Sequence, residues 1–259
     1  MRPWSLLDSR PLDGALNMAV DVALMGRARR TGETVFRAYT WARPTLSLGR
    51  NQTARGRYDP AALDERSVDV VRRPTGGRAI LHWRELTYSV TAPAGSLASA
   101  ADMYHSVNEI IVDALRRLGI DAAITSRSRR ERQPDEHPCF AEPSAGEIVA
   151  TTVNGSGKLV GSAQYLEGGA LLQHGSILLH DDQPLLHELT RGPAARSSAA
   201  SVAEALGRDV SPAEVTGALF ESVCLRTEAP PVMLDSEEIR AAAEEHATAF
   251  RDPLWTWRR

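Results

Sequence analysis

A cysteine and a lysine are the strongest candidates for covalent chemistry in this chain. Cys139 lies in a polar stretch that contains several arginines, and positive surroundings lower the pKa of a thiol and favour the nucleophilic thiolate. Lys158 is the single lysine among 259 residues that include 29 arginines. An arginine cannot release a proton or act as a compact, adjustable charge, so the retained lysine is a candidate for those tasks. The alternatives are an inert loop thiol and a lysine retained by chance.

A glycine pair, Gly76–Gly77, forms a second candidate site, with Arg72 and Arg73 before it and His82 after it. Glycines let backbone N–H groups approach a ligand closely, and paired arginines can bind an anionic group. A hairpin turn with solvated arginines is the alternative. The pair is not a Walker A loop, because no Gly-Lys-Ser/Thr follows, and the three spaced glycines of dinucleotide sites are absent.

Two more stretches, Gly157 to Gln164 and Leu172 to Ile177, combine small residues with apolar neighbours. Small residues in a strand often mark the close approach of a ligand or of another backbone. The alternative for the second stretch is a core strand with a satisfied histidine. The candidate binding residues here are Gly161, Ser162, Ala163, Gln164, His174 and Gly175. Cys224 lies between Val223 and Leu225, which predicts a buried structural cysteine.

The elements that must position these residues follow from periodicity and turn signals. Strands are expected in residues 34–41, 68–71 and 86–90, the last two around the glycine turn, and an antiparallel meander in residues 148–153, 158–165 and 170–179. Helices are expected around residues 16–24, over 103–118 with Gly119 ending it, and from Ser211 and Asp235 onward. Residues 126–143 are expected to form a long loop. Strands followed by helices, without strict alternation, predict an α+β fold with a single domain over residues 1–259.

Composition narrows the function classes. The net charge is −3, which does not predict nucleic-acid binding, and apolar residues make up 42%, which is enough for a core. No apolar run reaches the roughly 18 residues of a membrane helix, and no signal segment follows Met1. Two cysteines exclude a disulfide framework and a cysteine-rich zinc site, so no metal is predicted. We expect a soluble, cytoplasmic protein without a membrane partner.

Taken in order, several stretches resemble the lipoate–protein ligase and octanoyltransferase family, whose catalytic domain is also that of the biotin protein ligases. These stretches are short but are spread along most of the chain. They are Asp13-Gly14, Asn17 to Asp21, Leu48 to Gln52, Arg72 to Gly77 with His82, Leu86 to Ser89, Gly157 to Gln164, Gln173 to Ser176, and Trp255 to Trp257. The resemblance implies that family's fold, with mixed, largely antiparallel sheets flanked by helices. Each motif by itself is weak, but the ordered set is specific.

Within that family the chain is more similar to the LipM-type octanoyltransferases than to the ligases. Where ATP-dependent ligases usually have a third glycine and then His-Asp, this chain has Arg78 and His82-Trp83. Its Cys139-Phe140 followed by Pro143-Ser144 resembles the acyl-thioester cysteine loop of the transferases. Trp83 stands where an Asp is common and weakens the match at that position.

The resemblance implies transfer of an octanoyl group from acyl carrier protein to a lysine of a lipoyl-domain protein, such as the glycine cleavage H protein or a dehydrogenase E2 subunit. Cys139 would be the nucleophile, and Lys158 would activate it or accept the proton of the incoming amine. No ATP or metal would be required. Leu81, Ala79 and Val160 were expected beside the acyl tunnel. The other predicted binding residues are Arg72, Arg73, Gly76, Gly77, His82, Gly161, Ser162, Ala163, Gln164, His174 and Gly175.

Four functions remain open on these grounds. The first is the cysteine-dependent octanoyltransferase, in which Arg127, Arg129, Arg130 and Arg132 could attract the acidic carrier protein unless they are merely a solvated loop. The second is an ATP-dependent lipoate–protein ligase, which would need ATP and Mg²⁺. The third is an amidotransferase between two lipoyl-domain proteins, and the fourth is a catalytically silent module that binds acyl carrier or lipoyl proteins.

Overall fold

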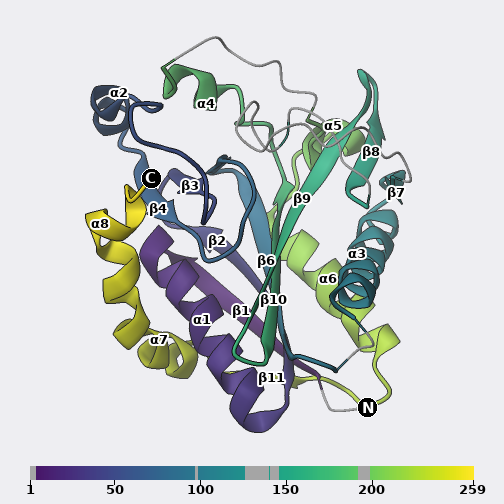
Figure 1. Ribbon diagram of the computed structural model, residues 1–259. Coiled ribbons are helices and arrows are strands. Elements are labelled where there is room, and N and C mark those ends of the chain that lie inside the picture. The colour runs from purple at the N-terminus through teal and green to yellow at the C-terminus, as the bar shows by residue number, and fades with distance from the viewer. Residues whose placement is uncertain (1–3, 97–98, 126–139, 141–145, 192–198) are drawn as a thin grey trace.

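The computed structural model describes residues 4–96, 99–125, 140, 146–191 and 199–259 (Figure 1). Cys139, His137 and the four arginines 127, 129, 130 and 132 lie outside this part of the chain. The strands are β1 Trp4–Leu12, β2 Thr34–Trp41, β3 Thr45–Leu48, β4 Asp69–Arg72, β5 Ile80–His82, β6 Glu85–Pro93, β7 Ala122–Ile124, β8 Ile148–Thr152, β9 Gly155–Glu167, β10 Ala170–Leu178 and β11 Val232–Met233. The helices are α1 Gly14–Thr31, α2 Pro60–Glu65, α3 Ala100–Arg117, α4 Leu185–Glu188, α5 Val202–Leu206, α6 Pro212–Arg226, α7 Ser236–Arg251 and α8 Pro253–Thr256.

Eight strands form one mixed sheet in the order β11-β1-β2-β6-β10-β9-β8-β7, and β4-β3-β5 form a second, smaller sheet. β2, β6, β10, β9, β8 and β7 pair antiparallel in turn, whereas β1 pairs parallel with β2 and with β11. The predicted meander of β8, β9 and β10 is confirmed, and so is the α+β fold class with its largely antiparallel sheet. The N-terminal strand β1 is not part of the sequence prediction.

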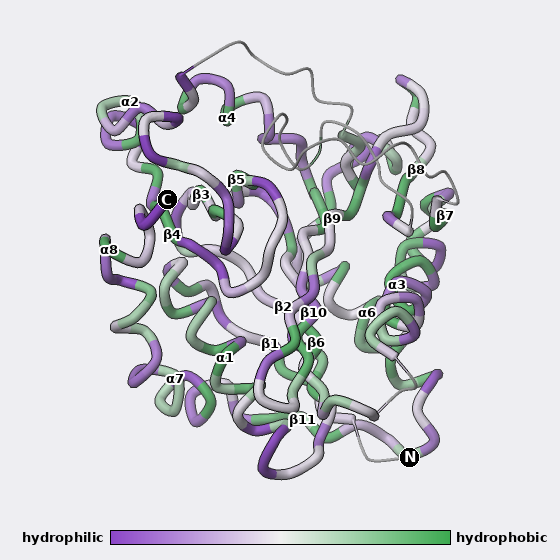
Figure 2. Tube along the Cα trace, in the orientation of Figure 1, coloured by the Kyte–Doolittle hydropathy of each residue, from purple (hydrophilic) through white to green (hydrophobic). Residues whose placement is uncertain are grey.

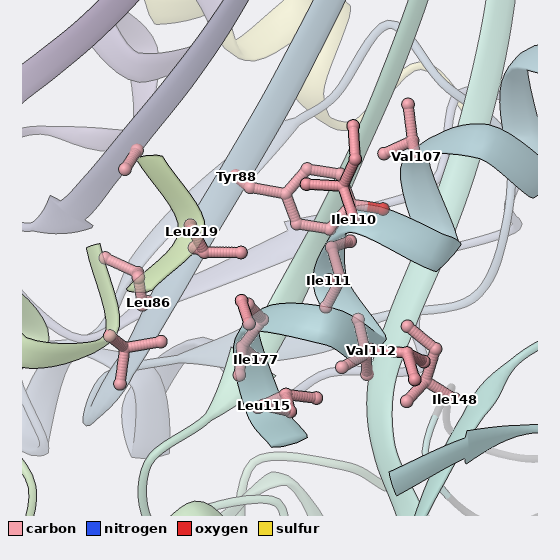
Figure 3. Close-up of a cluster of buried hydrophobic side chains, with 14 of the residues drawn as sticks. Leu86, Tyr88, Val107, Ile110, Ile111, Val112, Leu115, Ile148, Ile177 and Leu219 are labelled. Carbon is pink, nitrogen blue, oxygen red and sulfur yellow. The ribbon is translucent and has the colours of Figure 1, made fainter. Parts of the chain in front are cut away.

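Helices cover both faces of the large sheet (Figure 1). One hydrophobic cluster joins the buried faces of α3 and α6 to alternate strand residues such as Phe36, Tyr88 and Ile177 (Figure 3). On the opposite face, α1 and α7 pack over Val35 and Tyr39. The side chains of β2 therefore alternate between two cores, as the period of two in a strand requires. In Figure 2 the central strands β6 and β10 accordingly carry hydrophobic stretches.

The predicted helices that begin at a capping residue are confirmed. Ser99 accepts a hydrogen bond from the backbone of Asp102 at the start of α3, and Gly119 follows its end with a φ of +92°. Ser211 and Asp235 cap α6 and α7 in the same way. Cys224 is exposed, so the prediction of a buried structural cysteine is wrong. The buried stripe of α6 contains its neighbour Val223, and Cys224 falls on the other side of the helix.

The glycine pair does not join two neighbouring strands, as the predicted turn between residues 71 and 86 required. The chain leaves β4, passes through Gly76–Gly77 and enters β5, which pairs antiparallel with β3 on the opposite side from β4. β6 then belongs to the large sheet. The glycine loop itself meets the large sheet, because its Thr75 hydroxyl lies 2.7 Å from Nε2 of His174 on β10, and a cavity lies between the two sheets beside this contact.

Candidate active site

A narrow cavity of about 40 Å³ lies between the two sheets, and most of the predicted binding residues line it. Its walls come from α1, β2, β3, the glycine loop, β5, β6, β9 and β10. Its lining residues are Met18, Tyr39, Trp41, Ser47, Arg73, Gly77, Ile80, His82, Thr87, Gly161, Ser162, Ala163, His174, Gly175 and Ser176. The predicted residues Arg73, Gly77, His82, Gly161, Ser162, Ala163, His174 and Gly175 are thus brought together from four separate stretches of sequence.

Small residues keep this space open. A Cβ at Gly175 would lie 2.5 Å from the carbonyl oxygen of Gly161 and 2.9 Å from the hydroxyl of Ser162. The Ser162 hydroxyl in turn shares a 2.7 Å hydrogen bond with Tyr88. Apolar wall residues such as Trp41 and Ile80 complete a lining that suits a hydrocarbon chain.

One cavity imidazole, His82, is held in a chain of hydrogen bonds. Its Nδ1 lies 2.8 Å from Oε1 of Glu85, and its Nε2 lies 2.7 Å from the hydroxyl of Ser47. A carboxylate accepts hydrogen bonds, so we assign the Nδ1 hydrogen to the bond with Glu85. Arg73 donates to the same Ser47 hydroxyl at 3.0 Å, which leaves the Ser47 hydrogen free to donate to Nε2. The ring also stacks on Trp41 at 4.1 Å.

The second imidazole, His174, also forms a hydrogen bond through each of its ring nitrogens. Its Nδ1 lies 3.0 Å from Oδ2 of Asp21, and its Nε2 lies 2.7 Å from the hydroxyl of Thr75. Asp21 is buried, and Arg37 and Ser89 each donate to its Oδ1 at 2.8 Å. His174 therefore connects β10 and helix α1 to the glycine loop through Thr75.

Burial and nearby charges set the protonation states of Asp21 and His174. Burial by itself would raise the pKa of Asp21, but the hydrogen bond from His174 and the charge of Arg37 outweigh it and lower that pKa. Burial lowers the pKa of His174, and its contact with Asp21 only partly offsets that effect. The pair therefore exists at neutral pH as a buried carboxylate beside an uncharged imidazole, with Arg37 supplying the compensating charge.

Lys158 lies on β9, beyond the Gly161 end of the cavity wall. Its side chain is 1% exposed, and its Nζ forms an ion pair with Oε1 of Glu147 at 2.6 Å. The same Nζ lies 5.0 Å from the centre of the Phe140 ring. Phe140 is fully buried and packs with the cavity residue Ile80. The predicted catalytic lysine is therefore connected to the cavity through one aromatic side chain.

Arg72 does not line the cavity, although the sequence prediction grouped it with Arg73. It is fully buried, and its guanidinium donates to the carbonyl oxygens of Gly49 at 2.6 Å, Gln52 at 2.8 Å and Thr256 at 2.8 Å. Burial, followed by the nearby charge of Arg258, lowers the pKa of Arg72 to about 10. Arg72 thus ties the C-terminal tail to the loop after β3 and takes a structural role.

Several other predicted binding residues also lie outside the cavity lining. Gln164 donates to the carbonyl of Ala100 and to Gln173, and Gly76 is not among the lining residues. The expected tunnel residues Leu81, Ala79 and Val160 are buried in other hydrophobic clusters. β5 alternates its side chains between two faces, so Ile80 and His82 face the cavity and Leu81 does not.

Sequence reasoning missed the partners that orient the two histidines, namely Asp21, Ser47, Thr75 and Glu85. Only Asp21 offered a signal. It lies on the buried face of α1, and a carboxylate is rarely fully buried without a partner. Within the described ranges, we find no group of three or more His, Cys, Asp or Glu side chains that could hold a metal ion. In the same part of the chain, no helix has both the length and the hydrophobicity needed to cross a bilayer.

The model of the lipoyl protein ligase A/B catalytic domain family matches residues 13–224 of the chain. The chain belongs to this family. The match includes the cavity, Lys158 and both histidines, so the site lies within the catalytic-domain region of the lipoyl protein ligase A/B family. The family prediction made from the sequence is confirmed.

Relatives extend the similarity over the whole chain. The chain is 38% identical to "Octanoyltransferase LipM" of Kyrpidia tusciae over 279 aligned positions, which cover 100% of both chains. It is 34% identical to the protein of the same name from Geobacillus kaustophilus, covering 99% of this chain and 98% of the relative. For the Bacillus subtilis protein of that name the identity is 32%, with the same coverage.

Solved structures support the fold. A bipartite lipoate protein ligase from Thermoplasma acidophilum aligns with a TM-score of 0.77 at 22% identity, covering 99% of this chain and 97% of that one. A lipoate-protein ligase A bound with ATP aligns with a TM-score of 0.76 at 24% identity, covering 99% and 98%. At these identities the likeness establishes the arrangement of sheets and helices around the cavity.

Proposed function

We propose that this protein transfers an octanoyl group from acyl carrier protein to a lysine of a lipoyl-domain protein, through a thioester on Cys139. It is an acyltransferase of lipoate biosynthesis, as its full-length similarity to three proteins named octanoyltransferase LipM supports. The donor and the cysteine intermediate are the proposal's own additions.

The contact between Lys158 and Phe140 carries the proposal. Cys139 is bonded to Phe140, whose ring lies 5.0 Å from Nζ of Lys158 and packs on the cavity residue Ile80. The residue that follows Cys139 in the sequence therefore lies beside the protein's single lysine and at one end of the cavity. An ammonium near a thiol favours the thiolate, and an amine can take a proton from an incoming nucleophile.

The chemistry balances as two successive acyl exchanges. The Cys139 thiolate attacks the carbonyl carbon of the octanoyl thioester, the bond from that carbon to the carrier's sulfur breaks, and the carrier thiol leaves with a proton from the Lys158 ammonium. The neutral lipoyl-domain amine then attacks the enzyme thioester, the bond to the Cys139 sulfur breaks to restore the thiolate, and Lys158, now an uncharged amine, takes a proton from the attacking nitrogen. The donor and the enzyme intermediate are both thioesters, so the acyl group moves between them at little thermodynamic cost and neither ATP nor a metal is required.

The cavity would hold the end of the octanoyl chain during both steps, and at about 40 Å³ it would have to widen to take all eight carbons. Trp41, Ile80 and Met18 supply apolar surface, and Gly161, Ala163 and Gly175 leave room beside the strands. His174 contacts the glycine loop through Thr75, and His82 is linked to it through Ser47 and Arg73, which donates to the Gly76 carbonyl. Backbone N–H groups near that loop are candidates for stabilising the oxyanion of each tetrahedral intermediate.

The test is intact-protein mass spectrometry after mixing with octanoyl-acyl carrier protein in the absence of ATP. Wild type should gain one octanoyl group, and Cys139→Ser should gain no hydroxylamine-labile adduct. Adding a lipoyl domain should discharge the wild-type adduct and octanoylate the domain. An absence of adduct on wild type, together with octanoylation that requires ATP and free octanoate, would instead establish a ligase.

A further inference from the structure

Most arginines in the described part of the chain have carboxylate partners, and the exceptions concentrate in one place. Pairs such as Arg10–Glu237, Arg84–Asp182 and Arg208–Glu214 are typical of the surface. No described Asp or Glu side chain pairs with five arginines that gather around the loop after β3, the glycine loop and the C-terminal tail. These five, which we call the arginine face, are Arg50, Arg55, Arg78, Arg258 and Arg259.

Contacts between the loop and the tail hold these arginines close together. The carbonyl oxygen of Arg259 accepts hydrogen bonds from the backbone N–H groups of Ala54 at 3.0 Å and Arg55 at 2.9 Å. The Arg55 side chain donates to the Trp257 carbonyl at 2.7 Å. Arg258 donates to the Arg50 carbonyl and stacks on the Trp255 ring at 3.9 Å.

The arginine face borders the cavity. The backbone N–H of Arg50 donates to the carbonyl of Thr75, and the carbonyl of Arg78 accepts a 2.7 Å hydrogen bond from the cavity residue Arg73. Arg50 also donates to the hydroxyl of Tyr165, on the strand that carries Ala163. Like charges held this close repel one another, and an anionic partner would relieve that repulsion.

We propose that the arginine face is the docking surface for the acidic acyl carrier protein that donates the octanoyl group, an inference that rests on the proposed function. The donor delivers its acyl group on a phosphopantetheine arm, which includes an anionic phosphodiester. The acceptor delivers a lysine amine, which is a cation at neutral pH. A positive surface beside the cavity therefore attracts the reactive arm of the donor and repels that of the acceptor.

The distance between the arginine face and Lys158 also suits the long phosphopantetheine arm of the donor. Tyr165, which Arg50 contacts, lies seven residues after Lys158 on β9, or about 23 Å along the strand. The phosphopantetheine arm is several times longer than a lysine side chain, so the donor's arm can cover that separation. A lipoyl domain docked on the arginine face would have to extend toward Lys158 itself, because its lysine side chain is too short to cover this distance.

The test compares two charge reversals with a matched control. Arg78→Glu and Arg259→Glu change side chains for which the structure shows no hydrogen bond. Arg30→Glu, on the exposed end of α1, changes the net charge on another surface by the same amount as each single reversal and serves as the control. Each variant is assayed with octanoyl-acyl carrier protein and with a small octanoyl thioester that lacks the protein, while the lipoyl domain is varied separately.

We expect the double variant Arg78→Glu/Arg259→Glu to raise the KM for the carrier protein about tenfold at low salt, and high salt to narrow the difference. The rate with the small thioester, the KM for the lipoyl domain and the behaviour of Arg30→Glu should stay at wild-type values. An unchanged carrier KM, or a rise in the lipoyl-domain KM instead, would overturn the docking assignment. Failure of wild type to accept an octanoyl group from either thioester would contradict the proposed function itself.

Discussion

Lys158 and Glu147 form a buried ion pair, with Nζ 2.6 Å from Oε1, at the point where β9 passes the Phe140 ring. Glu147 begins the stretch that leads into β8, and β8 pairs with β9. Removing one partner of such a pair leaves an uncompensated charge, which is costly in a buried position. The pair therefore fixes the position of the Lys158 side chain.

Replacing Lys158 with arginine tests whether the reaction needs a group that can exchange a proton. An arginine retains the positive charge near Glu147 but stays protonated. We expect Lys158→Arg to lower kcat for octanoyl transfer by roughly 10²–10⁴-fold, as for loss of a general acid–base group. Steady-state kinetics measure the loss, and circular dichroism should show an intact fold. A variant with near wild-type kcat would mean that Lys158 contributes charge without proton transfer.

Two glycines in neighbouring loops should respond very differently to alanine. A Cβ at Gly49 would lie 1.9 Å from the carbonyl oxygen of Gly77, whereas a Cβ at Gly76 would meet nothing within 4 Å. We expect Gly49→Ala to lower the free energy of unfolding by at least about 2 kcal/mol, because backbone must move to relieve the clash. Gly76→Ala should stay within about 0.5 kcal/mol of wild type. Urea denaturation compares the two, and equal effects would contradict the close approach of the loops.

The acyl cavity predicts a change in chain-length preference when its small wall residues are enlarged. Ala163 lines the cavity and lies opposite His174 in the pairing of β9 with β10. We expect Ala163→Leu to lower kcat/KM for octanoyl thioester at least about tenfold, because added methyl groups remove the space for the end of the chain. A butanoyl thioester should be affected much less. Competition assays with the two thioesters measure the ratio, and an unchanged ratio would place the acyl chain elsewhere.

The Asp21–His174 pair predicts that acid destabilises the protein before the surface carboxylates titrate. The pKa of His174 is lowered by burial, so the unfolded chain binds its proton more readily than the folded one. The stabilising effect is therefore complete above the unfolded pKa of about 6.5 and is lost as the pH falls through the folded value. Asp21, whose pKa is also lowered, adds a further loss below about pH 4.

Unfolding free energies measured in urea at pH 7, 6 and 5 test this expectation. His174→Gln keeps a hydrogen-bonding side chain but removes the titrating group, so its stability should fall less between pH 7 and pH 5 than that of wild type. His105→Gln is a suitable control, because His105 is an exposed residue of α3. A decline as steep in His174→Gln as in wild type would assign the acid sensitivity to another group.

The sequence by itself determined the family and most of the longer helices and strands. The 3.6-residue stripe of α3 with Gly119 after it, the turns between β8, β9 and β10, and the capping residues Ser211 and Asp235 are local signals. Local signals act within a few residues, so they can be recognised before any tertiary contact is known. The ordered motifs likewise brought Gly77, His82, Ala163 and His174 into one predicted site.

Only the tertiary structure decided how these residues support one another. The bonds from Glu85 and Ser47 to His82, and from Asp21 and Thr75 to His174, depend on how strands and loops from the two sheets meet. Arg72 and Arg73 are adjacent in sequence, yet β4 points one toward the C-terminal tail and the other toward the cavity. Successive side chains of an extended chain face opposite ways, and what lies on each side is set by distant segments.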